Sequence, residues 1–164
     1  MLAILADYQP HTVASLAHTL KNSGVSLVQL WEMILILMGA KYLALLQDEQ
    51  AAAHCAPTCQ RLNRYVLARA RHSNEISHVA SPLVGGGLGI NRFHQLFLLA
   101  RAEGATTPLQ WAQSAWDVLH AQNERLIKQG TALHTPQENI EELRVQAEHF
   151  QQKVLPILQA MRVA

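Results

Sequence analysis

The sequence has few charged side chains, and those it has are scattered. Charged residues make up 15% of the 164 positions, against roughly 25% in an average soluble domain, while hydrophobic residues make up 49%. The 13 basic and 12 acidic residues form no long run of like charge, which disfavours a nucleic-acid-binding surface. A chain of this length can bury a core, and its low charge predicts that part of the apolar surface covers a partner.

Signals for export, membrane insertion and disulfide bonding are also missing. The two cysteines, Cys55 and Cys59, are too few for a disulfide framework, and residues 1–5 lack the basic start and long apolar stretch of a secretory signal. The most apolar window, residues 27–40, contains Gln29 and Glu32 and is shorter than the roughly 20 residues that span a bilayer. We therefore expect a cytoplasmic protein with no membrane or nucleic-acid partner.

Motifs of catalytic and metal sites are absent as well. The sequence contains neither a G-x-S-x-G motif nor an H-E-x-x-H motif. His54, Cys55 and Cys59 form a metal-like cluster, but a zinc site usually has four ligands and no second cysteine pair follows. Reduced thiols beside a linker are the favoured interpretation, with a metal site as the alternative. We expect no catalytic residue, no cofactor-binding residue and no metal in this chain.

The first 50 residues have the pattern of a winged-helix-like subdomain. The apolar spacing predicts helices over 2–7, 12–21 and 26–38, and Ser26 and Gln29 have the spacing of a capping box. Residues 42–46 are predicted to form the strand of a wing. Both faces of the third helix are apolar, so we expect it to be covered on most sides. It has no basic residue between Leu27 and Met38, which disfavours DNA binding.

The sequence pattern of residues 51–164 predicts a linker followed by a helical subdomain. Small residues and a proline over 51–57 indicate the linker, and the subdomain over 58–164 begins with a helix over 59–71. A Gly-rich β-hairpin is predicted at 76–90 and a helix at 91–103. Two start signals, Thr107-Pro108 and Thr135-Pro136, predict helices over 108–129 and 136–154. Their apolar seams are typical of a long antiparallel helix hairpin, after which Pro156 restarts a terminal helix. The predicted fold class is mainly α, or α+β.

Two features leave a choice between a structural and a functional role. The glycines at 85–87 and 89 could approach an anion, but Ile90 and Asn91 follow where a phosphate loop has lysine and a hydroxyl residue. A structural turn is favoured over ligand contact. The three tryptophans could line a groove, but their helical spacing favours the core. They are Trp31, Trp111 and Trp116.

Several segments resemble a known family. Residues 79–87 and 90–100 resemble the C-terminal region of bacterial S-adenosylmethionine-dependent methyltransferases that carry a methyltransferase regulatory domain. The patterns over 12–46, 61–63 and 155–158 are also similar to the winged-helix-like and helical tail of that family. The apolar pattern begins at Leu2 with no capping residue before it, which is how a chain cut from a longer protein would begin.

The resemblance implies a non-catalytic accessory domain that serves substrate positioning, regulation or dimerisation. S-adenosylmethionine would then be bound by a catalytic domain of the same parent chain, and the other expected partners are a protein substrate or a second copy. The resemblance places a substrate or partner loop at Ser81, Gly85, Gly86, Gly87 and Arg92. The alternative is a freestanding winged-helix-type interaction or transcription-related module.

Overall fold

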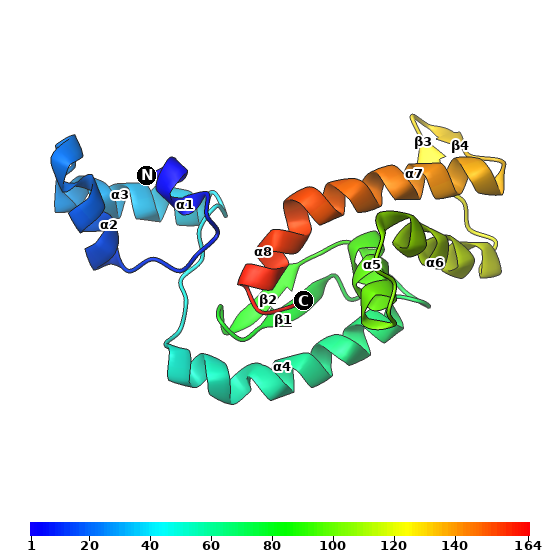
Figure 1. The fold of residues 1–164 in the computed structure, drawn as a ribbon, viewed down its shortest axis with the longest axis horizontal. Coiled ribbons are helices and arrows are strands. Elements are labelled where there is room, and N and C mark those ends of the chain that lie inside the picture. The colour runs from blue at the N-terminus through cyan, green and yellow to red at the C-terminus, as the bar shows by residue number, and fades with distance from the viewer.

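Helices make up most of the computed structural model, which describes all residues from 1 to 164, and they lie in two units joined by a connector (Figure 1). The N-terminal unit is formed by residues 1–40, the connector by 41–48 and the body by 49–164. No pair of helices or strands from the two units packs extensively. The predicted mainly helical class is confirmed, with two small antiparallel sheets in the body.

The N-terminal unit has three helices around a small core. They are α1 (Leu2–Leu5), α2 (Val13–Leu20) and α3 (Leu27–Gly39), with a 3-10 turn (Lys21–Ser23) after α2. Thr12 caps α2, and the predicted capping box of Ser26 and Gln29 begins α3. The buried side chains of this unit are Leu16, Leu20, Leu30 and Ile34.

The predicted wing is wrong. Residues 42–46 form no strand, and Tyr42 and Leu45 are exposed. The connector instead reaches the hairpin of the body, where the Gln47 amide donates to the Leu83 carbonyl at 2.9 Å. A strand needs a hydrogen-bonded neighbour along its edge, and no neighbouring strand pairs with residues 42–46.

The predicted linker at 51–57 is also wrong, because these residues lie inside α4 (Glu49–Arg69). Asp48 caps this helix by accepting a hydrogen bond from the Ala51 amide at 2.9 Å, and three alanines follow, the residue with the highest helix propensity. Pro57 removes one backbone donor. The helix continues through it because the second half is anchored by buried Asn63, Val66 and Leu67.

The body continues with a hairpin and two helices, as predicted. Strand β1 (His78–Ser81) pairs antiparallel with β2 (Gly86–Gly89), so that Val79 faces Leu88 and Ser81 faces Gly86. Then come α5 (Arg92–Ala102) and α6 (Pro108–Ala121). Helix α6 is shorter than the predicted 108–129. It ends before Asn123, which has a φ of 56°, a conformation that a helix does not accommodate.

A second, very small hairpin then leads to the C-terminal helices. Strands β3 (Ile127–Lys128) and β4 (Thr131–Ala132) precede α7 (Pro136–His149), which packs along α6. Two packed helices were predicted here, with Thr107 and Thr135 as caps, and both capping boxes are present. A π-helical turn (Phe150–Val154) leads into α8 (Leu155–Ala160), the predicted terminal helix.

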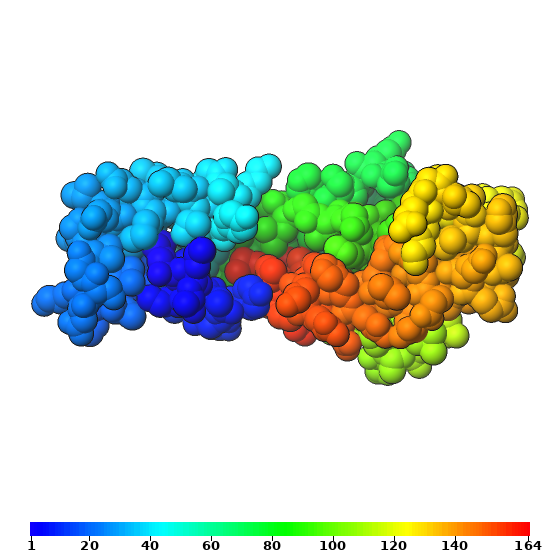
Figure 2. All heavy atoms as spheres, turned by 90° about the horizontal axis from the view of Figure 1, so that it is seen from above, coloured from blue at the N-terminus to red at the C-terminus, as the bar shows by residue number.

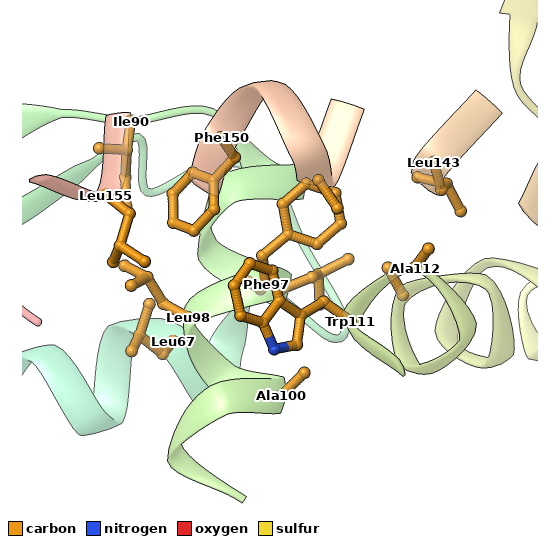
Figure 3. Close-up of a cluster of buried hydrophobic side chains, with 14 of the residues drawn as sticks. Leu67, Ile90, Phe97, Leu98, Ala100, Trp111, Ala112, Leu143, Phe150 and Leu155 are labelled. Atoms are coloured by element: carbon orange, nitrogen blue, oxygen red, sulfur yellow. The ribbon is translucent and has the colours of Figure 1, made fainter. Parts of the chain in front are cut away.

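An aromatic cluster lies at the centre of the body (Figure 3). The ring of Phe150 lies 5.7 Å from that of Phe97 and 6.1 Å from that of Trp111, measured between centroids. Trp111 and Trp116 are buried, as the core interpretation predicts, whereas Trp31 is 50% exposed and the same prediction is wrong for it. These rings fix α5, α6 and the π-helical turn against one another.

No single helix is long and apolar enough to cross a membrane. Helices α2 and α3 meet the length and composition requirement only when taken together, and they are bent by 120° relative to each other.

Candidate functional site

Ser81, the first residue of the predicted loop, is buried and fully used in internal hydrogen bonds. Its hydroxyl donates to the Met161 carbonyl at 2.8 Å and accepts from the Val84 amide at 3.2 Å. It therefore joins the hairpin turn to the end of α8 and has no surface to offer a ligand.

Gly85 closes the hairpin turn. Its φ of +67° lies in the left-handed region, and a β-carbon there would lie 3.1 Å from Oε1 of Gln47. The Gln47 side chain also donates to the Pro82 carbonyl. This glycine is needed for the conformation and for the close approach of Gln47, which agrees with the favoured interpretation of a structural turn.

Gly86 and Gly87 lie on β2 and are exposed. A β-carbon at Gly86 would meet nothing within 4 Å, whereas one at Gly87 would lie 3.3 Å from Cβ of His78. A β-carbon at Gly89 would also approach this side chain, at 3.7 Å from Nε2 of His78. Gly87 and Gly89 therefore leave room for the imidazole of His78, and a side chain added at Gly86 would enter open space.

Arg92 bonds to a different set of elements from Ser81. Its Nε donates to the Ala70 carbonyl at 2.8 Å, and its two terminal nitrogens donate to Gln122 at 2.7 Å and to Glu124 at 2.8 Å. The guanidinium thus joins the end of α4 to the loop after α6. The structure brings Ser81 and the glycines together in the hairpin, but Arg92 bonds to none of them.

Asn63 is a residue that the sequence alone did not single out. Its side chain pairs with both backbone groups of Ala80, at 2.9 Å and 2.7 Å. The sequence signal that could have identified it is its position, because this polar residue lies on the same face of the helix as Val66 and Leu67. Every buried polar side-chain atom of the chain has a hydrogen-bond partner, so the interior offers no unpaired group aimed at a ligand.

His54, Cys55 and Cys59 are not arranged as a metal-binding group. His54 is exposed, and the Cys55 thiol lies 3.2 Å from Nε2 of Gln47 and 3.6 Å from the Pro82 carbonyl. Burial raises the pKa of the Cys59 thiol, and the neighbouring Cys55 raises it further. A raised pKa keeps the thiol protonated at neutral pH, so it is a poor nucleophile.

The largest unexplained feature is the exposed apolar side of α3. Five large apolar side chains are each 50% to 69% exposed and follow helical spacing. We name this set the α3 apolar surface: Leu27, Val28, Trp31, Leu35 and Ile36. The expectation that this chain covers α3 on most sides is wrong, because only Leu30 and Ile34 are buried.

Such a surface is costly in water. Burying a large apolar side chain stabilises a protein by about 1.5–3 kcal/mol, and contiguous exposed apolar patches commonly mark interaction sites. Glu32 is the only charged residue in α3. The arrangement can therefore bind another apolar protein surface, and it provides none of the basic groups that DNA phosphates require.

Comparison with known proteins finds a longer relative. An uncharacterized protein of the cyanobacterium Synechocystis sp. is 32% identical over 155 residues, which cover 94% of this chain and 30% of the relative. The chain thus spans less than a third of the length of the curated relative that it matches. No protein-family model matches the sequence, and no solved structure matches it.

Proposed function

We propose that the chain is a non-catalytic accessory domain of a bacterial S-adenosylmethionine-dependent methyltransferase. In this proposal the α3 apolar surface packs against the catalytic part of the same polypeptide, and the domain positions a protein substrate, regulates the enzyme or supports its dimerisation. The observation that carries the proposal is the α3 apolar surface itself, which no other part of this chain covers.

Two further observations support it. The resemblance of residues 79–87 and 90–100 to the methyltransferase tail falls on the β-hairpin and α5. The Synechocystis relative is about three times as long as this chain, so in that protein the matching segment has a long polypeptide beside it.

The predicted loop has a divided role in this proposal. Ser81 and Gly85 hold the hairpin in place through the contacts described above, and Arg92 joins the end of α4 to the loop after α6. Gly86 and Gly87, which are exposed, are the positions at which a substrate or partner would touch the hairpin.

The alternative of a freestanding winged-helix-type module has less support. In such a module the helix that enters the major groove needs arginine, lysine or amide side chains to reach phosphates and bases. The corresponding exposed positions of α3 are Trp31, Leu35 and Ile36. Salt-dependent DNA binding with a steep slope would favour the alternative over our proposal.

The test uses the Synechocystis relative in its full-length form and in a form that lacks the 155 matching residues. Calorimetry measures S-adenosylmethionine binding, and transfer of tritiated methyl groups to protein acceptors measures activity. We expect both forms to bind the cofactor with similar affinity, and only the full-length form to show normal transfer.

A matched control uses the isolated chain described here, which we expect not to bind S-adenosylmethionine. Tight binding by the isolated chain, or loss of cofactor binding in the shortened relative, would overturn the proposal. So would a full-length relative that binds no S-adenosylmethionine.

A further inference from the structure

A cavity of about 490 Å³ lies where the N-terminal unit meets the end of the body. It is lined by the loop between α1 and α2, by the end of α8 and by Leu83 of the hairpin turn. Figure 2 shows the same junction, with the dark blue N-terminal residues lying beside the red C-terminal helix. The volume falls within the range of about 300–1,000 Å³ that is usual for ligand sites.

Two residues with unusual backbone conformations line this cavity. Five non-glycine residues of the chain have a positive φ, and two of them, Tyr8 at 58° and Arg162 at 57°, line the cavity. Bulky side chains rarely adopt this left-handed conformation. Residues held in such conformations cluster at binding and catalytic sites.

Arg162 occupies a position that normally belongs to glycine. The Val163 amide donates to the Leu158 carbonyl at 2.8 Å, and the Arg162 amide donates to the Gln159 carbonyl at 2.9 Å. These two bonds form the Schellman motif that ends a helix, in which the left-handed residue is most often glycine. A glycine would end α8 as well, so the arginine side chain serves a purpose beyond the helix end.

The charges that line the cavity are already paired. The Asp7 carboxylate accepts hydrogen bonds from His11 at 3.0 Å and from the Gln9 amide at 2.9 Å. Both terminal nitrogens of Arg162 donate to the Glu49 carboxylate at 2.8 Å. The polar groups left for a ligand are therefore uncharged.

The residues that carry these groups are Gln9, Gln159 and Tyr8. The Nε2 of Gln9 donates to the Asp7 carbonyl at 3.4 Å, so its second N–H and its Oε1 are left for a ligand. A primary amide both donates and accepts hydrogen bonds, as a peptide group does, and the Tyr8 ring with Pro10 and Pro156 supplies apolar contact. We propose that this junction cavity binds an extended, uncharged peptide segment, with Gln9 and Gln159 bonded to its backbone. The bound segment would join the two units, which pack little against each other.

The proposal does not depend on the methyltransferase assignment. Its test uses substitutions that are compatible with the backbone conformation at each position. A phage-displayed library of random heptapeptides is selected on the wild-type chain, and calorimetry then measures binding of the best synthetic peptide. Tyr8→Gly and Gln159→Ala remove side chains of the cavity. Lys41→Gly is the matched control, because Lys41 also has a positive φ, of 63°, but does not line the cavity.

We expect the peptide to bind wild type and Lys41→Gly equally, and Tyr8→Gly and Gln159→Ala at least tenfold more weakly. Thermal melting checks folding, and Tyr8→Gly is expected to melt no lower than wild type because glycine adopts this conformation readily. The proposal is overturned if no peptide is enriched or if the peptide binds all four proteins alike. It is also overturned if binding is lost in Trp31→Ala but kept in Tyr8→Gly, since that result would place the peptide on α3.

Discussion

The side chain of Asn63 in α4 acts as a hydrogen-bonding neighbour for the backbone of Ala80 in β1. Its Nδ2 donates to the Ala80 carbonyl at 2.9 Å, and its Oδ1 accepts from the Ala80 amide at 2.7 Å. Strand β1 has β2 on one edge only, so this pairing satisfies the other edge at Ala80. The Asn63 side chain thus ties the hairpin to α4.

Asn63→Ala is therefore expected to destabilise the chain by about 2–4 kcal/mol. Two hydrogen bonds are lost, and each backbone group left unpaired near the core costs about 1–3 kcal/mol. Urea denaturation followed by circular dichroism measures the loss. Arg61→Ala, an exposed position on the same helix, is the control, and equal stability of the two variants would contradict this assignment.

Arg92→Lys is expected to cost about 1–3 kcal/mol, because a lysine cannot reproduce the planar set of donors that reaches Ala70, Gln122 and Glu124. Chemical denaturation is again the measurement. The control, Arg64→Lys, changes an exposed residue of α4 and should be neutral. If Arg92 served only a surface partner, both changes would leave the free energy of unfolding unaltered.

Gly85→Ala is expected to cost about 1–2 kcal/mol, because an L-residue is strained in the left-handed conformation and the new methyl group would crowd Gln47. Gly86→Ala is a matched control one residue away, since an added β-carbon there meets open space. The difference between the midpoints of thermal unfolding measures the effect. A Gly86→Ala variant that loses as much stability would refute the structural role given to Gly85.

The pH dependence of stability should carry a contribution from His94. Burial lowers the pKa of this imidazole below its ordinary value of 6.5, and the charge of His149 lowers it further. The unfolded chain then takes up a proton at a higher pH than the folded chain, so this contribution is complete above about pH 6.5 and is lost as the pH falls.

His94→Gln should therefore reduce the loss of stability between pH 7.5 and pH 5.5, measured by denaturation at both values. His54→Gln, a change at an exposed histidine, should leave that loss as it is in wild type. An unchanged pH dependence in His94→Gln would show that the ring is not shielded from protons in the folded chain.

Local chemistry made much of this fold predictable from the sequence. The three capping boxes, at Ser26, Thr107 and Thr135, lie where the spacing placed them, because a cap involves only residues three positions apart. The hairpin around Gly85 was predictable for the same reason. These signals depend on short stretches of chain.

The predictions that were wrong depend on interactions between residues that are distant in the sequence. The alanines after Asp48 resembled a linker, but Asn63 and its buried neighbours anchor the helix that contains them. Residues 42–46 had the composition of a strand but found no strand to pair with. Trp31 has the same spacing as a core tryptophan, and its exposure depends on which elements lie beside α3.

The candidate site was predictable only in outline. The sequence predicted that part of the apolar surface covers a partner. The structure leaves the α3 apolar surface exposed, and its binding to a partner stays a prediction. The side chains of Ser81 and Arg92 were expected at the surface of a loop, but they bond to Met161 and Gln122, which are distant in sequence. No local pattern encodes such contacts.

The claim that the α3 apolar surface is a packing surface within a longer polypeptide can be tested by amide hydrogen exchange. Exchange in α3 is measured in the isolated chain, and exchange in the matching helix is measured in the 155-residue segment of the Synechocystis relative, both alone and within the full-length relative. Our account predicts exchange at least tenfold slower in the full-length relative than in the segment alone. Equal exchange in those two forms would contradict it.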